Sequence, residues 1–217
     1  MRYFPAFLDL QGRSAVVIGG GRIAERKVLT LLACGARVTV VSPGLTPKLS
    51  YLVQAGAIRG HARRWRPVDL KEAFLIMATT DDRKANAEIA RRAQADSRLV
   101  NIADDPARCN VIMPSVITRG DLIIAVSTSG KSPSLARRIR RELEGSFGAE
   151  YGKFICLLGS IRKQVQSRVP SMARRRRILQ RLAASDLLTL LRQGKKRQVQ
   201  KRIQQIVGLK DLTLNGY

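Results

Sequence analysis

The sequence predicts an α/β fold that is followed by a basic, all-helical C-terminal region. Three observations support this fold class. Over about the first 110 residues, short apolar runs rich in β-branched residues alternate with helical patterns, as in a parallel sheet with crossover helices. Two further apolar runs flank a short turn, which predicts a small antiparallel hairpin. After residue 150, strand patterns end and amphipathic helical patterns rich in Lys and Arg begin.

The first strand, turn and helix form the clearest motif. Residues 14–18 predict a strand buried on both faces, and residues 24–33 predict a helix. Between them, Gly19, Gly21 and Ala24 fit the G-x-G-x-x-G/A pattern of a Rossmann-type dinucleotide-binding turn. Gly19 allows a tight turn, and Gly21 allows the backbone to approach a pyrophosphate at the helix N-terminus. From these residues alone, an ordinary glycine turn is an equal alternative.

The second strand, residues 37–41, ends without the acidic residue that commonly binds the adenosine ribose of NAD. Ser42, Pro43 and Gly44 stand there instead, and this stretch has no Arg dedicated to a 2′-phosphate. The Ser42 hydroxyl and the neighbouring backbone can still hydrogen-bond the ribose. The choice between NAD and NADP stays open at this point, with NAD preferred.

The remaining elements of the sheet follow in order. An extended lead-in, anchored by Phe4, Phe7 and Leu8, precedes the first strand. Trp65, in a basic loop, is interpreted as a packing anchor in preference to a stacking platform. The other expected elements are a helix over 45–55, a strand beginning at Ile58, a strand over 73–80, a helix over 85–95 and a strand over 99–103.

Polar residues follow two of these strands. Thr79 and Thr80 lie where open α/β sheets bind ligands, so cofactor contact is as plausible for them as a structural role. Asp81 and Asp82 are both placed where a residue could cap the next helix. Asp104 and Asp105 follow the strand over 99–103; adjacent carboxylates on an extended backbone point opposite ways, so at most one faces a cleft. Their spacing alone favours turn residues.

Residues 111–126 predict a hairpin around a turn at 119–121. A hydroxyl-rich loop follows, and Pro133 is placed as the first residue of a helix. Such a loop suits a carboxylate or phosphate ligand, although an ordinary capped helix explains it equally well. The candidate ligand-binding residues of the loop are Ser127, Thr128, Ser129, Lys131 and Ser132.

The formal net charge is +24, from 40 Lys and Arg against 16 Asp and Glu. From residue 151 onward, Lys and Arg number 16 and acidic residues number two, Asp186 and Asp211. Such a field favours a polyanion: nucleic acid, an anionic membrane surface or a small polycarboxylate. The apolar stripes of the three tail helices are interpreted as too few for a core, so the tail is expected to dock on the first domain or on a second subunit.

The three cysteines are far apart and odd in number, which favours reduced thiols. With one histidine in the chain, we expect no metal site built from His and Cys. No apolar run approaches the roughly 18 residues that a transmembrane helix needs. The N-terminal residues show no signal-peptide pattern, and we therefore expect a cytoplasmic protein.

Five segments in order resemble the precorrin-2 dehydrogenase module of siroheme synthases and their stand-alone relatives. The resemblance covers residues 1–150, and the tail is similar only in being helical and basic. With 217 residues there is no room for the methyltransferase domain of the fused enzymes, so we expect the stand-alone form. The segments are Val17–Lys27, Ala78–Asp82, Asn101–Pro106, Ile112–Ser115 and Val126–Arg137.

The resemblance implies NAD-dependent oxidation of precorrin-2 to sirohydrochlorin and, in some members, insertion of ferrous iron to give siroheme. It implies that Asp104 is the general base and that Thr128 matches a position where some relatives carry a phosphorylatable serine. The substrate bears eight carboxylates, which accounts for part of the positive charge. The residues that match the nucleotide-binding stretches are Gly21, Arg22, Ile23, Ser42, Pro43 and Gly44.

We therefore expect three regions: an NAD-binding Rossmann domain over 1–112, a dimerisation and substrate region over 113–147, and a basic helical domain over 148–217. A homodimer is expected. Asp104 and the loop over 127–132 are expected to converge with the cofactor at the carboxyl edge of the sheet. The alternative is an NAD(H)-sensing regulator that binds nucleic acid through its basic tail, although no helix-turn-helix or aromatic RNA motif supports it.

Overall fold

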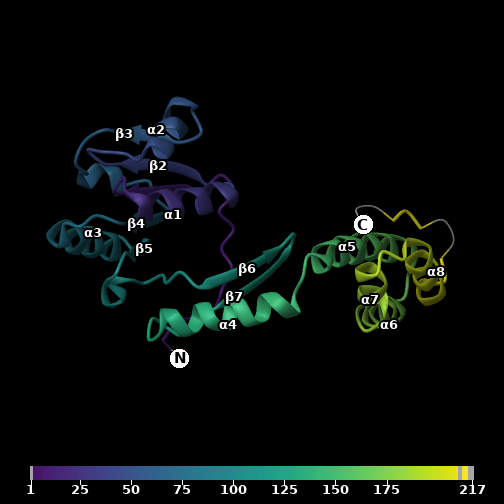
Figure 1. The fold of residues 1–217 in the computed structure, drawn as a ribbon. Coiled ribbons are helices and arrows are strands. Elements are labelled where there is room, and N and C mark those ends of the chain that lie inside the picture. Colours follow the sequence, from purple (N-terminus) through teal and green to yellow (C-terminus); the bar gives the residue numbers. More distant parts are fainter. Residues whose placement is uncertain (1, 210–211, 215–217) are drawn as a thin grey trace. The chain divides into compact units, whose positions relative to one another are not determined.

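The computed structural model describes residues 2–209 and 212–214 (Figure 1). The chain forms two compact units, Met1–Met113, here called unit 1, and Pro114–Tyr217, called unit 2. Unit 1 holds the parallel sheet, and unit 2 holds a hairpin and helices. The finer division into regions 1–112, 113–147 and 148–217 stays a prediction.

Unit 1 is built on a sheet of five parallel strands in the order β3-β2-β1-β4-β5. The central strand, β1, pairs with β2 from Ser14 opposite Arg37 to Ile18 opposite Val41. This order matches the first five strands of the doubly wound dinucleotide-binding sheet, so the predicted fold class is confirmed. The bounds are β1 Ser14–Ile18, β2 Arg37–Val41, β3 Arg59–His61, β4 Leu75–Ala78 and β5 Leu99–Ile102.

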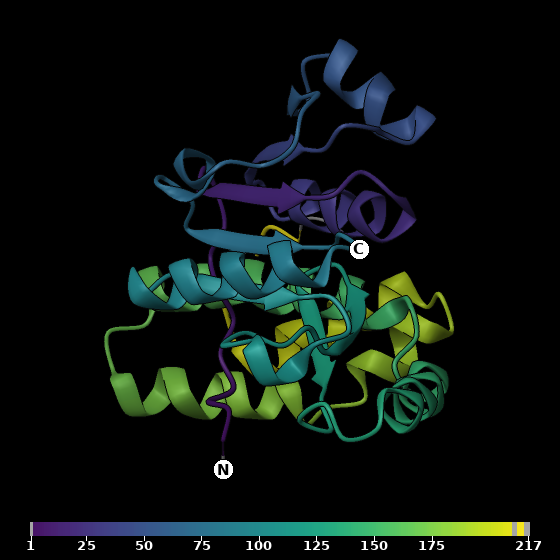
Figure 2. The same cartoon turned by 90° about the vertical axis from the view of Figure 1, so that its left-hand side faces the viewer.

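Helices cover both faces of this sheet (Figure 2). Helices α1 (Arg22–Ala33) and α2 (Pro47–Gln54) share a core with Val17, whereas α3 (Arg83–Ala95) shares a core with Val16. Alternate residues of β1 therefore face opposite layers, as the twofold period of a strand requires. Because both faces are covered, the central strands β1 and β4 are almost continuous apolar runs, whereas the edge strand β3 is polar and largely exposed.

The expected anchors of the N-terminal lead-in are wrong. Phe4 is 86% exposed and Phe7 71% exposed, and Leu8 is exposed as well. Leu10 is the buried residue of this segment. The reason is that the extended lead-in meets the core only where Gly12, at φ +66°, turns it toward β1 and donates its N–H to the Gly35 carbonyl at 2.8 Å.

In unit 2, the predicted hairpin is formed by β6 (Ser115–Arg119) and β7 (Leu122–Val126), which are antiparallel. Its turn contains Gly120 at φ +59°. One face of the hairpin packs on α4 (Pro133–Ser146), and Ile117 is almost fully buried there. The opposite face, which includes Val116 and Ile123, is exposed.

Four helices complete unit 2 and share a core of their own. They are α5 (Glu150–Arg168), α6 (Met172–Ala183), α7 (Leu187–Arg192) and α8 (Lys196–Val207). The expectation that the tail has too few helices for a core is wrong, because the short α7 was not predicted. Leu187 and Leu190 of α7 belong to that core, with residues such as Leu157, Leu182 and Ile203.

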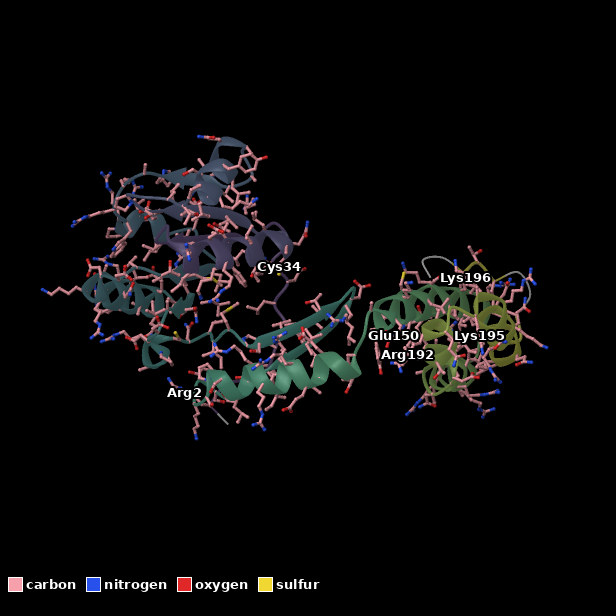
Figure 3. All side chains as sticks on the ribbon, viewed as in Figure 1. Arg2, Cys34, Glu150, Arg192, Lys195 and Lys196 are labelled. Atoms are coloured by element: carbon pink, nitrogen blue, oxygen red, sulfur yellow. The ribbon has the colours of Figure 1, made fainter. Side chains whose placement is uncertain are left out.

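An ion pair joins the first of these helices to the third. Glu150, at the start of α5, accepts hydrogen bonds from the Arg192 guanidinium at 2.5 and 3.1 Å (Figure 3). The hydrogen bond from Arg192 lowers the pKa of the Glu150 carboxyl. Among the described residues, no helix combines the length and apolar character needed to cross a membrane.

Candidate functional site

A cleft of about 880 Å³ opens in unit 1 at the carboxyl ends of β1, β2 and β4. This is the edge at which open α/β sheets bind ligands. The structure brings all nine predicted cofactor residues together around it, although their contact with a ligand stays a prediction. They are Gly19, Gly21, Arg22, Ile23, Ser42, Pro43, Gly44, Thr79 and Thr80.

The three glycines make a floor that larger residues would fill. Gly19 has φ +115°, and a Cβ there would lie 2.5 Å from Thr79 Oγ1. A Cβ on Gly20 would lie 2.0 Å from the Gly44 carbonyl oxygen. Gly21 has no atom within 4 Å of its Cβ position, so its open side faces free space. The backbone is therefore accessible to a flat or phosphorylated ligand at Gly21, which fits a dinucleotide.

Helix α1 begins directly after this floor. Its N-cap is Gly21, and no side chain caps it. The first backbone N–H groups of α1 can therefore donate to an anion, and the helix dipole favours negative charge there. Arg22 and Ile23, in the first turn, line the cleft beside these donors.

The turn that follows β2 contributes only neutral residues to the cleft. The Ser42 hydroxyl donates to the Gly44 carbonyl at 2.8 Å, which shapes the turn. Thr46 continues this wall and donates its hydroxyl to Glu25 of α1 at 2.6 Å. Thr46 also caps α2 by accepting from Leu49 N–H.

Arg64 and Trp65 are among the cleft residues that were not predicted from the sequence. Trp65 also packs on the apolar cluster beneath α3, so it is a packing residue that at the same time lines the cleft. The loop reaches the cleft because β3 pairs with β2. Nothing in the loop's own sequence shows this long-range pairing.

The β4 end of the cleft is held by side-chain hydrogen bonds. Thr79 Oγ1 donates to the Ile18 carbonyl at 3.0 Å, and Thr80 Oγ1 donates to Asn86 Oδ1 at 2.9 Å. Asn86 donates in return to the Thr80 carbonyl. Asp82 caps α3 and accepts from two backbone N–H groups, which confirms the predicted capping role for Asp82 and not for Asp81.

Asp104 follows β5 at the same edge of the sheet, outside the residues that line the cleft. Its φ of +60° lies in the left-handed region, which non-glycine residues seldom adopt. Its side chain is exposed, and among the described residues no hydrogen bond or ion pair engages its carboxylate. Asp105, by contrast, forms an ion pair with Arg108. Of the two adjacent carboxylates, Asp104 is therefore the one available for chemistry.

A buried polar network holds the loop that carries Asp104. Lys27 Nζ of α1 donates to Asn101 Oδ1 at 2.5 Å, and Asn101 Nδ2 donates to the Val111 carbonyl at 2.9 Å. Cys109 Sγ accepts from Ile102 N–H at 3.1 Å. The later part of the loop, at Cys109 and Val111, is thereby tied back to β5, from which the loop starts. Burial lowers the pKa of the Lys27 ammonium, and its neighbour Arg26 acts in the same direction.

The three thiols are expected to differ in reactivity. Burial raises the pKa of the Cys109 thiol, whereas Cys34 and Cys156 are exposed. A thiol reagent such as DTNB should therefore modify Cys34 and Cys156 quickly in the native protein and Cys109 only after unfolding. Mass spectrometry of the modified peptides measures this. Rapid native modification of Cys109 would contradict the network described above.

The hydroxyl-rich loop lies in unit 2, before α4. Ser132 is the N-cap of α4, and Thr128 Oγ1 both donates to the Ser132 carbonyl and accepts from Ser132 N–H. Ser127 accepts from Ser129 N–H. The capped-helix interpretation is thus what the structure shows for the hydroxyls. Lys131 is exposed, and substrate contact by this loop stays a prediction.

Three family patterns match the chain in succession. One described as "Putative NAD(P)-binding" matches residues 6–115. One described as "Sirohaem biosynthesis protein central" matches 119–146, and one described as "Sirohaem synthase dimerisation region" matches 150–207. The chain belongs to the family described as putative NAD(P)-binding, and its later segments match two families named for sirohaem biosynthesis. The family resemblance drawn from five sequence motifs is confirmed, and so is the expected nicotinamide dinucleotide cofactor.

Individual relatives agree with this assignment. Siroheme synthase 1 of Serratia proteamaculans is 38% identical over 205 residues, which are 94% of this chain and 43% of that protein. Siroheme synthase 1 of Aeromonas salmonicida is 40% identical over 188 residues, 87% of this chain and 40% of that protein. The chain thus spans less than half the length of these curated relatives.

A solved structure of "SirC, precorrin-2 dehydrogenase" is similar over nearly the whole chain. Its TM-score is 0.79 at 28% identity, covering 93% of this chain and 99% of that one. This likeness extends beyond the dinucleotide unit to the hairpin and the helical region. None of these comparisons favours the nucleic-acid-binding alternative.

Proposed function

We propose that this chain oxidises precorrin-2 to sirohydrochlorin with NAD⁺. The observation that carries the proposal is an available carboxylate, Asp104, at the same sheet edge as a dinucleotide cleft, in a chain whose later segments match two families named for sirohaem biosynthesis. The SirC relative is described as a precorrin-2 dehydrogenase, which supports this substrate.

The cofactor would lie along the cleft. The backbone at Gly21 and the first N–H groups of α1 would hold the pyrophosphate, and Ser42 with Gly44 would face the adenosine ribose. Thr79 and Thr80 would line the nicotinamide side. When bound, NAD⁺ supplies the acceptor for the hydride.

Asp104 would serve as the base. Conversion of precorrin-2 to sirohydrochlorin removes one hydride and one proton, and the proton needs an acceptor. An Asp104 carboxylate oxygen is suited to take it, because the side chain is exposed and no hydrogen bond or ion pair engages it among the described residues. The network of Lys27, Asn101 and Cys109 holds the backbone that presents it.

The polycarboxylate substrate would be attracted by the basic surface. The net charge of +24 produces a field that concentrates an octacarboxylate near the protein. We assign the loop residues Ser127, Thr128, Ser129, Lys131 and Ser132 to substrate contact, with Lys131 as the cation. Phosphorylation of Thr128 would remove the hydroxyl contacts that shape this loop.

Insertion of ferrous iron into sirohydrochlorin is a second proposed activity. The metal enters as the pyrrole N–H protons leave, so the same Asp104 carboxylate can serve both reactions. Fluorescence loss of sirohydrochlorin on addition of cobalt or ferrous iron, compared with and without the protein, tests it. A rate equal to the uncatalysed rate would remove this activity from the proposal.

The principal test is an anaerobic assay of the purified protein with enzymatically prepared precorrin-2 and NAD⁺. NADH should form only when all three are present. Lack of NADH formation by a protein that binds NAD⁺ would overturn the assignment of the substrate.

We also propose a homodimer in the cytoplasm. The match to a dimerisation region and the exposed apolar face of the hairpin support the dimer, and the free thiols of all three cysteines fit a reducing compartment. On the exposed face, Val116 lies opposite Ala125, and Thr118 lies opposite Ile123. A second copy would cover this face.

The variant Ile123→Arg is expected to convert the dimer to a monomer, because it places a charge in the proposed contact. Val68→Arg in unit 1 is the matched control, since Val68 is 58% exposed and lies outside the hairpin. Light scattering after size exclusion measures the masses. If Ile123→Arg is still a dimer, the contact between the copies lies elsewhere. If the wild type is a monomer, the proposed dimer is refuted.

A further inference from the structure

The loop after β3 brings a guanidinium group to the β2 end of the cleft. Ser42 N–H donates to the His61 carbonyl at 3.1 Å, so this loop leaves the sheet beside Ser42. Arg64, which follows, lines the cleft together with Ser42, Pro43 and Gly44. In a Rossmann-type site this is where the adenosine ribose lies.

The conformation of the loop is fixed by the residue before Arg64. The Arg63 guanidinium donates two hydrogen bonds to Asp69, at 2.6 and 2.8 Å, and Arg66 N–H donates to the same carboxylate at 2.7 Å. The Arg63 hydrogen bond lowers the pKa of the Asp69 carboxyl. Trp65 packs on the core at the other side. The Arg63 guanidinium is therefore engaged by Asp69, and the loop is held both by this ion pair and by the packing of Trp65.

Arg64 itself is exposed, and in residues 2–209 and 212–214 its guanidinium has no hydrogen-bond or ion-pair partner. A five-donor planar group that lines a cleft without a partner suits a phosphate, which it can bind through two parallel hydrogen bonds.

The same end of the cleft lacks a carboxylate that would repel a phosphate. Ser42 occupies the position of the usual ribose-binding acid, and its hydroxyl donates to the Gly44 carbonyl. Glu25 is engaged by Thr46 and does not line the cleft. The acidic residues that do line it, Asp81 and Asp82, follow β4 and not β2.

We propose that Arg64 forms a site for a 2′-phosphate on the adenosine ribose, so that the cleft binds NADP⁺ as well as NAD⁺. The inference rests on the proposed dinucleotide site and deepens it. It assigns Arg64 as a residue that determines cofactor specificity, a role the sequence alone did not indicate because no Arg lies in the stretch that follows β2.

Trp65 allows binding to be measured without turnover, because it is the chain's one Trp and lines the cleft. Fluorescence and calorimetric titrations with NAD⁺, NADP⁺, ADP and adenosine 2′,5′-bisphosphate would be compared for wild type and Arg64→Met. We expect wild type to bind NADP⁺ within about tenfold of NAD⁺. Arg64→Met should weaken the two 2′-phosphorylated ligands by about tenfold to a hundredfold and change NAD⁺ and ADP by less than about twofold.

Arg66→Met is the matched control. It removes the same charge from the same loop, but Arg66 does not line the cleft, so both ligand classes should be little affected. Equal weakening of all ligands by Arg64→Met, or wild-type binding of NADP⁺ more than a hundredfold weaker than that of NAD⁺, would overturn the proposal. Failure of every dinucleotide to bind would overturn it together with the proposed function. Dinucleotide binding as expected, without oxidation of precorrin-2, would refute the proposed function alone.

Discussion

Asp104→Asn is expected to lower kcat for precorrin-2 oxidation by about 10²- to 10⁴-fold, the range typical of a lost general base. The dissociation constant for NAD⁺ should stay unchanged, because Asp104 lies outside the residues that line the cleft. Asparagine is chosen because it tolerates a left-handed backbone, which Asp104 adopts at φ +60°. Alanine at this position would add backbone strain and confuse loss of the carboxylate with loss of loop geometry.

The matched control is Asp105→Asn. Asp105 carries the neighbouring carboxylate but is paired with Arg108, so its removal should reduce kcat by less than about tenfold. Stopped-flow rates with precorrin-2 and calorimetric titration of NAD⁺ supply the two measurements. Wild-type turnover in Asp104→Asn, or a greater loss in Asp105→Asn, would remove Asp104 from the mechanism.

Substitution by alanine is expected to change the free energy of unfolding very differently at two neighbouring glycines. Gly20→Ala should destabilise the fold by about 1–3 kcal/mol, because its Cβ would lie 2.0 Å from the Gly44 carbonyl oxygen and the backbone has to move. Gly21→Ala should leave stability within about 0.5 kcal/mol of wild type. Its φ of −82° suits alanine, and no atom lies within 4 Å of the new Cβ.

Cofactor binding separates these variants further. The Gly21→Ala methyl group would occupy the space through which a pyrophosphate approaches the backbone, so NAD⁺ affinity should fall at least about tenfold in a fully folded protein. Urea denaturation and NAD⁺ titration of both variants test this. Wild-type NAD⁺ affinity in Gly21→Ala would show that the pyrophosphate lies elsewhere in the cleft.

The parts of the fold that depend on local pattern were predictable from the sequence. Strands β1 and β4 are buried on both faces and therefore appear as apolar runs. Ser132 and Asp82 mark the starts of the helices that they cap. The glycine motif also predicted the floor of the cleft, because it too is a local pattern. Helix α7 was missed because six residues, Leu187–Arg192, give too short a pattern to show a helical period.

Features that depend on long-range pairing were not predictable. Arg64 reaches the cleft through the pairing of β3 with β2, and Lys27 reaches Asn101 across a separation of 74 residues. The left-handed backbone at Asp104 and the ion pair that occupies Asp105 distinguish two carboxylates that the sequence presents as equivalent. The family resemblance selected Asp104, and its role as the general base stays a prediction.

The central claim is that a dinucleotide held in the cleft accepts hydride from precorrin-2. The most direct measurement is the amount of NADH and of sirohydrochlorin formed in the same anaerobic reaction of the wild-type protein. One NADH should form for each sirohydrochlorin, with no product when NAD⁺ is omitted. Sirohydrochlorin that forms at the same rate without NAD⁺, or NADH that appears without sirohydrochlorin, would contradict it.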